Sequence, residues 1–258
     1  MRLSNICERI IFGFSPTHRA VIYLVITILL SSFCDYSENS KSYFAQQHNI
    51  FNLYFVKFSW GWTLLSLGVY FLANIFQENE EQLNVKTQIE RLLKVTARIT
   101  IATLVWYYGT GLFLMVEEYS GVCNLPNYLN KNTCKENGFV WKGFDISGHC
   151  FLLVWCNLVI IEEVSNLSKF PKRNDYNTSR NNAIKNTDFR WTEMMFYLIC
   201  CVTMLWDLMI VCTNMFFHSA TEKILGTTIA ILSWAFLYKL IYNMYLSKYL
   251  GMRAKFGG

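Results

Sequence analysis

Residues 194–217 read MMFYLICCVTMLWDLMIVCTNMFF, an apolar run whose only charged side chain is Asp207. At about 1.5 Å per residue, a helix of this length is longer than the hydrocarbon core of a bilayer, which is about 30 Å thick. A carboxylate this deep in lipid is costly, so Asp207 should face protein or water rather than acyl chains. The run therefore predicts a membrane-spanning helix with one polar face.

Five more apolar runs occur along the chain. Of its 258 residues, 53% are hydrophobic and only 16% are charged, against about 25% charged in soluble domains. Backbone groups in lipid must be hydrogen-bonded within their own segment, so each run should form a helix. We predict an all-α, polytopic membrane protein in which residues 1–258 form a single transmembrane domain. Its six spans are expected at about 20–34, 58–76, 97–116, 145–161, 194–217 and 222–246.

The charges of the loops predict how these spans are oriented. Fifteen lysines and arginines fall in the N-terminal segment, the loops 77–96 and 162–193 and the C-terminal tail, whereas five fall in the other two loops. Positive residues are in excess on the cytosolic side of membrane proteins. We therefore expect both termini in the cytosol. No small-residue cleavage site follows the first run, which is expected to act as an uncleaved signal anchor.

Two of the nine cysteines, Cys123 and Cys134, lie in a loop that this topology places on the luminal side. A disulfide between them would need an oxidising lumen such as that of the endoplasmic reticulum (ER), and the sequence leaves the bonded and free states open. The other cysteines are mostly scattered in the spans, where thiols behave as small buried hydrophobes. No Cys-x-x-Cys or Cys/His metal spacing occurs, so no metal and no cofactor is expected.

Two of the four histidines, His149 and His218, lie where an apolar run meets a short polar segment. His149 begins the fourth span and His218 follows the fifth, so the topology puts both on the luminal face at a similar depth. Imidazole titrates near neutral pH and is costly inside a membrane, which suits a group that transfers protons or phosphoryl groups. The two histidines are therefore candidates for one shared luminal site.

The fifth span adds a polar stripe beside this candidate site. Thr203, Asp207, Asn214 and His218 are spaced by four, seven and four residues, which places them on one narrow face of a helix. Asp207 lies about 16 Å along the helix from His218, at 1.5 Å per residue, and cannot pair with it directly. Asn214 and Glu222, one turn to either side of His218, are candidates to orient its imidazole.

Several of these residues also have a structural interpretation. A single histidine at the edge of a span is more often an interfacial anchor or a helix contact than a catalytic group. Trp60, Trp62 and Asp207 are candidates for contact with lipid, and for the tryptophans the aromatic belt at the membrane interface is the default. Gly61 and Gly148 are equally explained by a close approach of two helices.

Three segments carry a resemblance to a known family. They are Phe58-Ser59-Trp60-Gly61-Trp62-Thr63-Leu64, Gly143-Phe144-Asp145-Ile146-Ser147-Gly148-His149-Cys150-Phe151-Leu152-Leu153, and Trp206-Asp207 followed by Phe217-His218. The chain resembles the fat storage-inducing transmembrane (FIT) family of ER proteins at these residues. Six spans with cytosolic termini match that family as well, so the resemblance covers nearly the whole chain.

The resemblance implies a multi-pass ER membrane protein that supports lipid droplet formation and binds diacylglycerol, triacylglycerol and membrane lipids, with no nucleic-acid partner. It also implies similarity to lipid phosphate phosphatases and an acyl-CoA diphosphatase activity. That reaction splits the pyrophosphate of fatty acyl-CoA into acyl 4′-phosphopantetheine and adenosine 3′,5′-bisphosphate. By the same resemblance, His149 of Ser147-Gly148-His149 is the general acid and His218 is the nucleophile. Glu222 stands where the phosphatases place an orienting aspartate.

The chain departs from the phosphatases at the residues that clamp the phosphoryl oxygens. The phosphatases carry a Lys…Arg-Pro motif and an arginine six residues before the nucleophile, whereas this chain has Cys212 at that position and no Lys…Arg-Pro motif. Phosphoryl transfer depends on neutralising the charge of these oxygens. Lys57, Lys142 and Lys223 are the nearby luminal cations and are the candidates to bind phosphate instead.

Two functions are therefore compatible with the sequence. One is a hydrolase that acts on a lipid pyrophosphate or phosphate ester at the luminal histidines. The alternative is a non-catalytic protein that binds diacylglycerol and triacylglycerol and partitions neutral lipid into droplets, with structural histidines. A small transporter is a weaker third interpretation, because neither an inverted repeat nor a pair of broken helices is visible.

Overall fold

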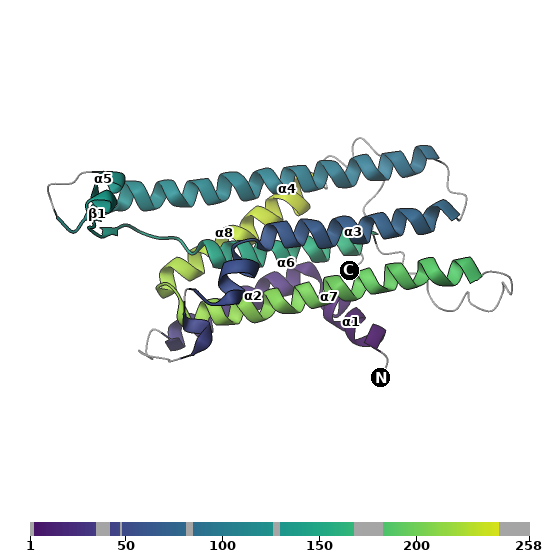
Figure 1. The fold of residues 1–258 in the computed structure, drawn as a ribbon, viewed down its shortest axis with the longest axis horizontal. Coiled ribbons are helices and arrows are strands. Elements are labelled where there is room, and N and C mark those ends of the chain that lie inside the picture. The colour runs from purple at the N-terminus through teal and green to yellow at the C-terminus, as the bar shows by residue number, and fades with distance from the viewer. Residues whose placement is uncertain are drawn as a thin grey trace.

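The computed structural model describes residues 3–34, 42–46, 48–80, 85–125, 130–167 and 183–242. Long helices run side by side and form an elongated bundle (Figure 1). The helices are α1 (Leu3–Phe12), α2 (Pro16–Cys34), α3 (Ser59–Glu80), α4 (Val85–Ser120), α5 (Lys131–Glu136), α6 (Gly148–Leu167), α7 (Ala183–Phe216) and α8 (Ala220–Ala235). Shorter elements are the 3₁₀ turn η1 (Tyr43–Ala45), the π-helical segments η2 (Phe51–Val56) and η4 (Phe236–Ile241), and the strands β1 (Val122–Cys123) and β2 (Trp141–Lys142).

Five of the described helices are long and apolar enough to cross a bilayer, which confirms the all-α, polytopic architecture. They cover Pro16–Phe33, Leu92–Ser120, Gly148–Asn166, Trp191–Phe216 and Ala220–Ile241. The remaining expected span, 58–76, corresponds to α3, which packs along α7 but is not among the five. Its first turns carry the buried polar residues Ser59, Thr63 and Ser66, which reduce its apolar character. The number of six spans therefore stays a prediction.

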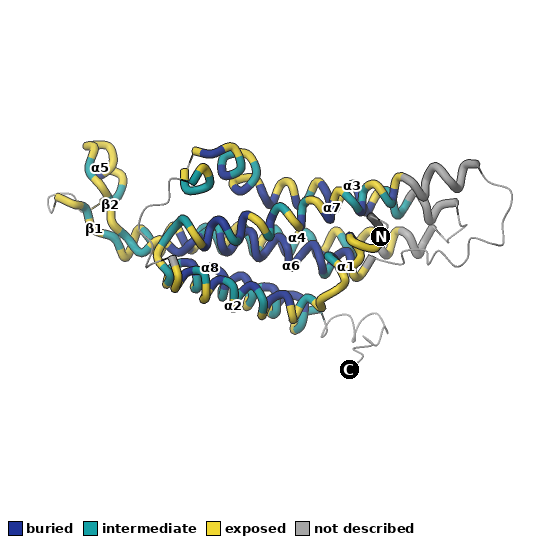
Figure 2. Tube along the Cα trace, turned by 90° about the horizontal axis from the view of Figure 1, so that it is seen from below, coloured by how far each residue is buried: buried dark blue, intermediate teal, exposed yellow. Residues whose placement is uncertain are grey.

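Helix α6 is the centre of the bundle. Every residue from 150 to 161 is buried, as the dark blue tube in Figure 2 shows. A helix that is apolar on all sides is one that other helices surround, and α2, α3, α7 and α8 all pack against α6. Helix α4 lies further out, with only 11% of its candidate span buried.

The two tryptophans of the Trp-Gly-Trp segment have different environments. Trp60 is 3% exposed, and its ring centroid lies 6.3 Å from that of Trp106 and 6.4 Å from that of Trp155. The expected contact between Trp60 and lipid is therefore wrong, because this side chain belongs to the core around α6. Trp62 is 41% exposed, in keeping with a position at the surface of the bundle.

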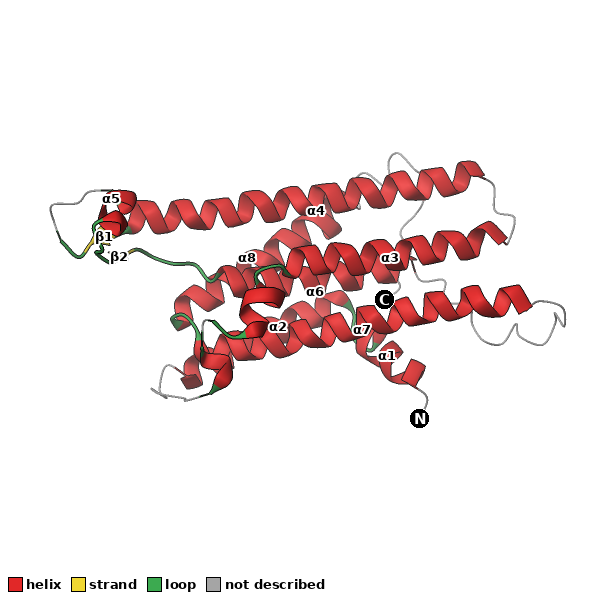
Figure 3. Cartoon of the chain, viewed as in Figure 1, coloured by secondary structure: helices red, strands yellow, loops and turns green. Residues whose placement is uncertain are grey.

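A small disulfide-bonded unit lies beyond the end of the bundle, between α4 and α6 (Figure 3). Strands β1 and β2 pair antiparallel, with Val122 opposite Lys142. Cys123 and Cys134 form a disulfide with a Cα–Cα distance of 5.9 Å, which answers the question that the sequence left open. We call this end of the bundle, where α3, α6 and α8 begin and α7 ends, the histidine end; the loop charges predict that it faces the lumen.

The start of the fourth span differs from the prediction. Helix α6 begins at Gly148 rather than at position 145, and residues 143–147 are not helical. The Ser147 N–H donates to the carbonyl oxygen of Glu222 over 3.2 Å, so this segment is held against the start of α8. A hydrogen bond to a residue so distant in the sequence keeps Asp145 outside the helix.

Candidate functional site

The two predicted catalytic histidines lie side by side at the histidine end. His149 is in the first turn of α6, and His218 follows the last turn of α7. Their ring centroids are 6.5 Å apart, with the rings tilted by 45°. This separation is well within the limit of about 10 Å beyond which two imidazoles cannot flank one phosphorus atom. The fold thus brings both rings to a single site.

His218 has a backbone conformation that is rare for a residue with a side chain. Its φ is 58°, and it is the only non-glycine residue with positive φ in the described part of the chain. Such a conformation costs of order 1 to 3 kcal/mol and is concentrated at functional sites. Here it permits the tight reversal from α7 to α8, which begins at Ala220.

Two carboxylates face the same nitrogen of His218. Nδ1 lies 3.6 Å from Asp145 Oδ2 and 3.7 Å from Glu222 Oε2. These distances exceed those of hydrogen bonds, yet two anions at Nδ1 favour a proton on that nitrogen and leave the lone pair on Nε2. Glu222 lies where an orienting carboxylate was expected. Asp145 is a second carboxylate that faces the same ring nitrogen.

Two backbone N–H groups hold the Glu222 carboxylate in place. The Asp145 N–H donates to Glu222 Oε1 over 3.3 Å, and the Ser219 N–H donates to Glu222 Oε2 over 2.9 Å. Ser219 and Glu222 form a capping box at the start of α8. Glu222 therefore caps a helix, binds the Asp145 backbone and faces His218 at the same time.

Partial burial raises the pKa of the Asp145 carboxyl above its ordinary value, although 56% of the side chain remains exposed. The neighbouring His218 imidazole acts on this pKa in the opposite direction, whereas Glu117 and Glu222 add to the rise. Two carboxylates close to one another in a partly desolvated place disfavour each other's charge. Asp145 is consequently easier to protonate than an ordinary aspartate.

Ser147 joins the start of α6 to α8. Its hydroxyl accepts from the Cys150 N–H over 3.3 Å, in addition to the backbone bond with Glu222. A Cβ on Gly61 or Gly148 would meet no atom within 4 Å, so the expected close helix approach at these glycines is wrong. The close approach occurs at Gly226 of α8, where a Cβ would lie 2.4 Å from the Ser147 carbonyl oxygen.

Asn214 does not orient His218 as expected. Its side-chain N–H groups donate to Thr27 Oγ1 over 3.3 Å and to the Ile210 carbonyl oxygen over 3.0 Å. Its Oδ1 accepts from the Cys150 thiol over 3.7 Å. Asn214 is fully buried and joins α2, α6 and α7, so it supports the packing beneath the histidines and does not contact the imidazole.

The three candidate phosphate-binding lysines lie in different places. Lys57 is exposed and is close enough to His149 for its charge to act on that imidazole. Lys142 is exposed in β2, and among the described residues no contact links it to either histidine. Lys223 is 2% exposed, and its ammonium donates to the Asn214 carbonyl oxygen over 2.8 Å, at the end of α7. Lys57 is therefore the candidate with the clearest access to a phosphate at the histidines.

Asp207 faces other helices, as predicted for a carboxylate deep in the membrane. Its Oδ1 accepts from the Tyr23 hydroxyl over 2.7 Å and from Asn157 Nδ2 over 2.8 Å. Its Oδ2 lies 3.6 Å from Arg19 Nη1. The polar stripe thus has two separate environments, one around Asp207 and one around His218.

Comparison with known proteins relates this geometry to a family. The family model described as "Fat storage-inducing transmembrane protein" (FIT) matches residues 40–117 and 115–238. The chain belongs to this family. The three FIT-like segments lie close together, because they include the start of α3, the start of α6, and the last third of α7 with the two residues that follow it. Trp206 Nε1 donates to Thr63 Oγ1 over 3.2 Å and so joins two of these segments directly.

Several curated FIT proteins are similar to this chain. The acyl-coenzyme A diphosphatase FITM2 of Drosophila melanogaster is 31% identical, over 94% of this chain and 62% of that protein. The protein of the same name from Danio rerio is 34% identical, over 78% of this chain and 75% of that protein. The protein of the same name from Homo sapiens is 31% identical, over 82% of this chain and 78% of that protein. The chain thus spans less than two thirds of the Drosophila protein, and no solved structure matches it.

Sequence reasoning missed two residues that shape this FIT site. Asp145 was part of the recognised segment, but only the non-helical course of residues 143–147 turns its carboxylate to His218. Gly226 lay in an apolar run with no local signal, because its role depends on the proximity of Ser147. Both depend on contacts between α6 and α8 that no local pattern encodes.

Proposed function

We propose that this FIT-family protein is an acyl-CoA diphosphatase that hydrolyses the pyrophosphate of fatty acyl-CoA at His149 and His218. The products are acyl 4′-phosphopantetheine and adenosine 3′,5′-bisphosphate. The observation that carries the proposal is the 6.5 Å separation of the two imidazoles at the histidine end of the bundle. The names of the similar proteins support the same substrate.

In this mechanism, His218 is the nucleophile. Asp145 and Glu222 face Nδ1, so the lone pair is on Nε2, which attacks one phosphorus of the pyrophosphate. A P–N bond forms, the bridging P–O bond breaks, and the leaving phosphate takes a proton from His149. His149 then accepts a proton from water as the water oxygen attacks the phosphohistidine, which releases His218. Each histidine ends in its starting state.

Lys57 is the proposed electrostatic partner of the substrate. No arginine lies in the loops at the histidine end, and phosphoryl transfer needs positive charge near the phosphoryl oxygens. The exposed ammonium of Lys57 beside His149 meets this need. Lys142 and Lys223 are secondary candidates, of which Lys223 would first have to release the Asn214 carbonyl.

The cellular role proposed with this activity is support of lipid droplet formation in the ER membrane. The Cys123–Cys134 disulfide fits an oxidising lumen at the histidine end, in agreement with the loop charges. Diacylglycerol, triacylglycerol and membrane lipids are the further lipid partners that we propose from the family.

Purified protein assayed with oleoyl-CoA tests the enzyme directly. We expect His149→Ala and His218→Ala each to lower kcat by about 10² to 10⁴-fold, the usual loss for a proton-transfer or nucleophilic group. His48→Ala is the matched control, because His48 is an exposed histidine outside the site. Trapping of a phosphorylated protein that disappears in His218→Ala would identify the nucleophile.

The non-catalytic alternative makes the opposite prediction. If both histidine variants are folded and hydrolyse oleoyl-CoA as fast as the His48→Ala control, the diphosphatase proposal is wrong. Neutral-lipid binding that persists in such variants would then be the remaining function.

A further inference from the structure

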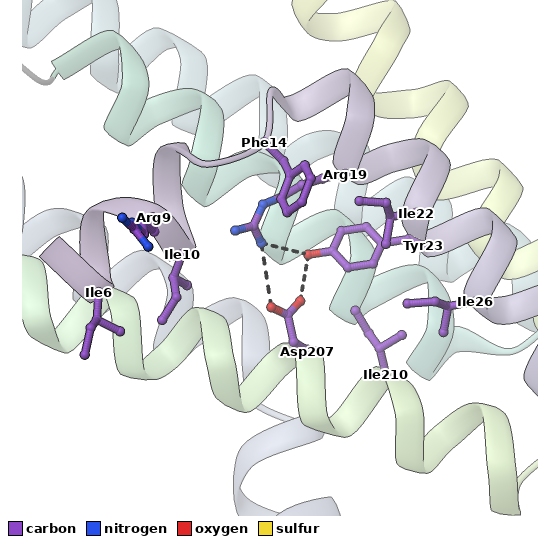
Figure 4. A pocket seen from close by; sticks show the side chains of 10 residues that line it. All are labelled: Ile6, Arg9, Ile10, Phe14, Arg19, Ile22, Tyr23, Ile26, Asp207 and Ile210. Carbon is purple, nitrogen blue, oxygen red and sulfur yellow. Dashed lines mark hydrogen bonds and ion pairs between the residues drawn. The ribbon is translucent and has the colours of Figure 1, made fainter. Parts of the chain in front are cut away.

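A cavity lies between α1, α2 and α7, away from the histidines (Figure 4). It has a volume of about 470 Å³, within the range of about 300 to 1,000 Å³ that is usual for ligand pockets. Most of its lining is aliphatic or aromatic and comes from Ile6, Ile10, Phe14, Ile22, Ile26 and Ile210. A cavity of this size and lining fits an acyl chain.

Charged side chains interrupt this apolar surface. Arg9, Arg19 and Asp207 all line the cavity, and their formal charges leave one net positive charge. The Asp207 carboxylate already has three partners, in Tyr23, Asn157 and Arg19. It therefore has little remaining capacity to bind a cationic ligand.

Arg19 has a hydrogen-bond donor in this cavity that remains without an acceptor in the described part of the chain. This residue is only 7% exposed, and its Nε is buried with no hydrogen-bond partner among the described residues. In the described part of the chain its Nη1 makes two long contacts, 3.4 Å to the Tyr23 hydroxyl and 3.6 Å to Asp207 Oδ2. In Figure 4, the guanidinium points into the space between α1 and α7, and no dashed line joins its other terminal nitrogen. A buried guanidinium with free donors calls for an anionic acceptor.

Arg9 provides a second cation at the rim of the same cavity. Its side chain is exposed, and within the described part of the chain no ion pair or hydrogen bond is found for it. Ile6 and Ile10 of the same helix point toward α7, and Arg9 extends from another side of α1 (Figure 4). Helix α1 thus contributes both a cation and aliphatic side chains to the lining, which an acidic lipid headgroup and its chain would contact.

We propose that this cavity binds an amphipathic lipid with an acidic headgroup, either a fatty carboxylate or an acyl-glycerol phosphate. The headgroup accepts hydrogen bonds from Arg19 and is attracted by the positive charge of Arg9. The acyl chain packs against the isoleucines. This site is distinct from the proposed diphosphatase site, since Asp207 is about 16 Å along α7 from His218, at 1.5 Å per residue. The α1 and α2 side of the cavity also lies outside residues 40–117 and 115–238 that match the FIT family model.

A purely structural cluster would behave differently from a lipid site. If Arg19, Tyr23 and Asp207 only fasten α2 to α7, then Arg19→Gln and Asp207→Asn both weaken the protein and neither improves binding. In a lipid site the two variants act in opposite directions. Asp207→Asn removes a carboxylate that competes for Arg19, so it strengthens the binding of an anion.

The experiment measures binding of three fluorescent lipids of the same chain length to the full-length protein in nanodiscs of phosphatidylcholine. They are a fatty acid, a lysophosphatidate and a monoacylglycerol. We expect one or both acids to bind at least about tenfold more tightly than the neutral lipid, as hydrogen bonds to a charged group require. Whichever of the two acids, the fatty acid or the lysophosphatidate, binds more tightly identifies the headgroup. Binding should persist in His218→Ala, which separates this result from the proposed hydrolysis.

Variants then locate the site. Arg19→Gln should reduce the affinity for the acid at least about tenfold, and exposed Arg9→Gln about threefold, whereas Asp207→Asn should increase it. Lys94→Gln is the control, because it removes one positive charge that does not line the cavity. Arg9 is on the surface, so its variant gives an answer even if Arg19→Gln does not fold. Equal binding of acid and neutral lipid, or wild-type affinity in Arg9→Gln without a gain in Asp207→Asn, would overturn the proposal.

Discussion

At the scale of single residues, the position of His218 is the most informative feature. Its imidazole could have been held by Asn214, one turn earlier in α7, but that amide is occupied by Thr27 and Ile210. Asp145 and Glu222 face the ring instead, from a segment before α6 and from the first turn of α8. The orientation of the proposed nucleophile therefore depends on two residues that only the tertiary fold brings to it.

This arrangement makes Asp145 a positioning residue for the proposed reaction. We expect Asp145→Asn to lower kcat about tenfold, because one of the two anions that keep the proton on Nδ1 is lost. The pKa of Asp145 is raised by burial, so the wild-type carboxylate loses its charge at a higher pH than an ordinary aspartate as the solution is acidified. The acid side of the kcat profile should accordingly change shape in Asp145→Asn.

A merely structural role for Asp145 predicts something else. In that case Asp145→Asn would alter the unfolding temperature, but the kcat that remains would depend on pH as it does in the wild type. Asp145→Glu, which retains the charge, should recover part of the rate. An unchanged kcat and an unchanged profile in folded Asp145→Asn would exclude the positioning role.

At the scale of elements, the contact between α6 and α8 sets the geometry of the site. Gly226 allows α8 to lie against the Ser147 carbonyl, where a Cβ would come within 2.4 Å of the oxygen. This contact involves backbone atoms on the α6 side, which cannot move aside as a flexible side chain could. We expect Gly226→Ala to destabilise the protein by about 1 to 3 kcal/mol, as overpacking does, and to displace Glu222 from His218.

The matched control is Gly61→Ala, since a Cβ at this helical glycine meets no atom within 4 Å. Replacing glycine by alanine in a helix is favourable by about 1 kcal/mol, so this variant should be as stable as wild type or more stable. Thermal unfolding in detergent and hydrolysis of oleoyl-CoA measure both effects. Equal stability and activity of the two variants would show that the contact at Gly226 does not matter.

The elements also show what could be predicted from the sequence. Long apolar runs are local in the chain, so the positions of α2, α4, α6, α7 and α8 follow from composition. The placement of both histidines at one end follows from the order of these helices. The start of α6 and the orientation of Trp60 could not be predicted, because a distant carbonyl on Glu222 and two distant indoles determine them.

At the scale of the whole molecule, helix α4 connects the disulfide-bonded unit to the bundle, although little of it is buried. A cluster of polar groups fastens it. Arg98 donates to Glu163 of α6 over 2.9 to 3.0 Å, and the Tyr238 hydroxyl of η4 donates to the same carboxylate over 2.9 Å. Glu163 is 1% exposed and also lines a cavity of about 210 Å³ between α3 and α4. This buried ion pair therefore helps to attach α4 to the bundle, together with the ring contacts Trp106–Trp60 and Phe113–Phe151.

Removing one partner of this pair leaves an uncompensated charge in an apolar interior. We expect Arg98→Met to destabilise the protein by about 3 to 5 kcal/mol, whereas the double variant Arg98→Met/Glu163→Gln should recover a large part of that loss. Thermal unfolding in detergent measures the double-mutant cycle. Because α4 leads through the disulfide-bonded unit to Asp145 and α6, its loosening in Arg98→Met should also lower the rate at the distant histidines. If the single variant unfolds like wild type, or if the double variant is no more stable than the single one, other contacts hold α4 to the bundle.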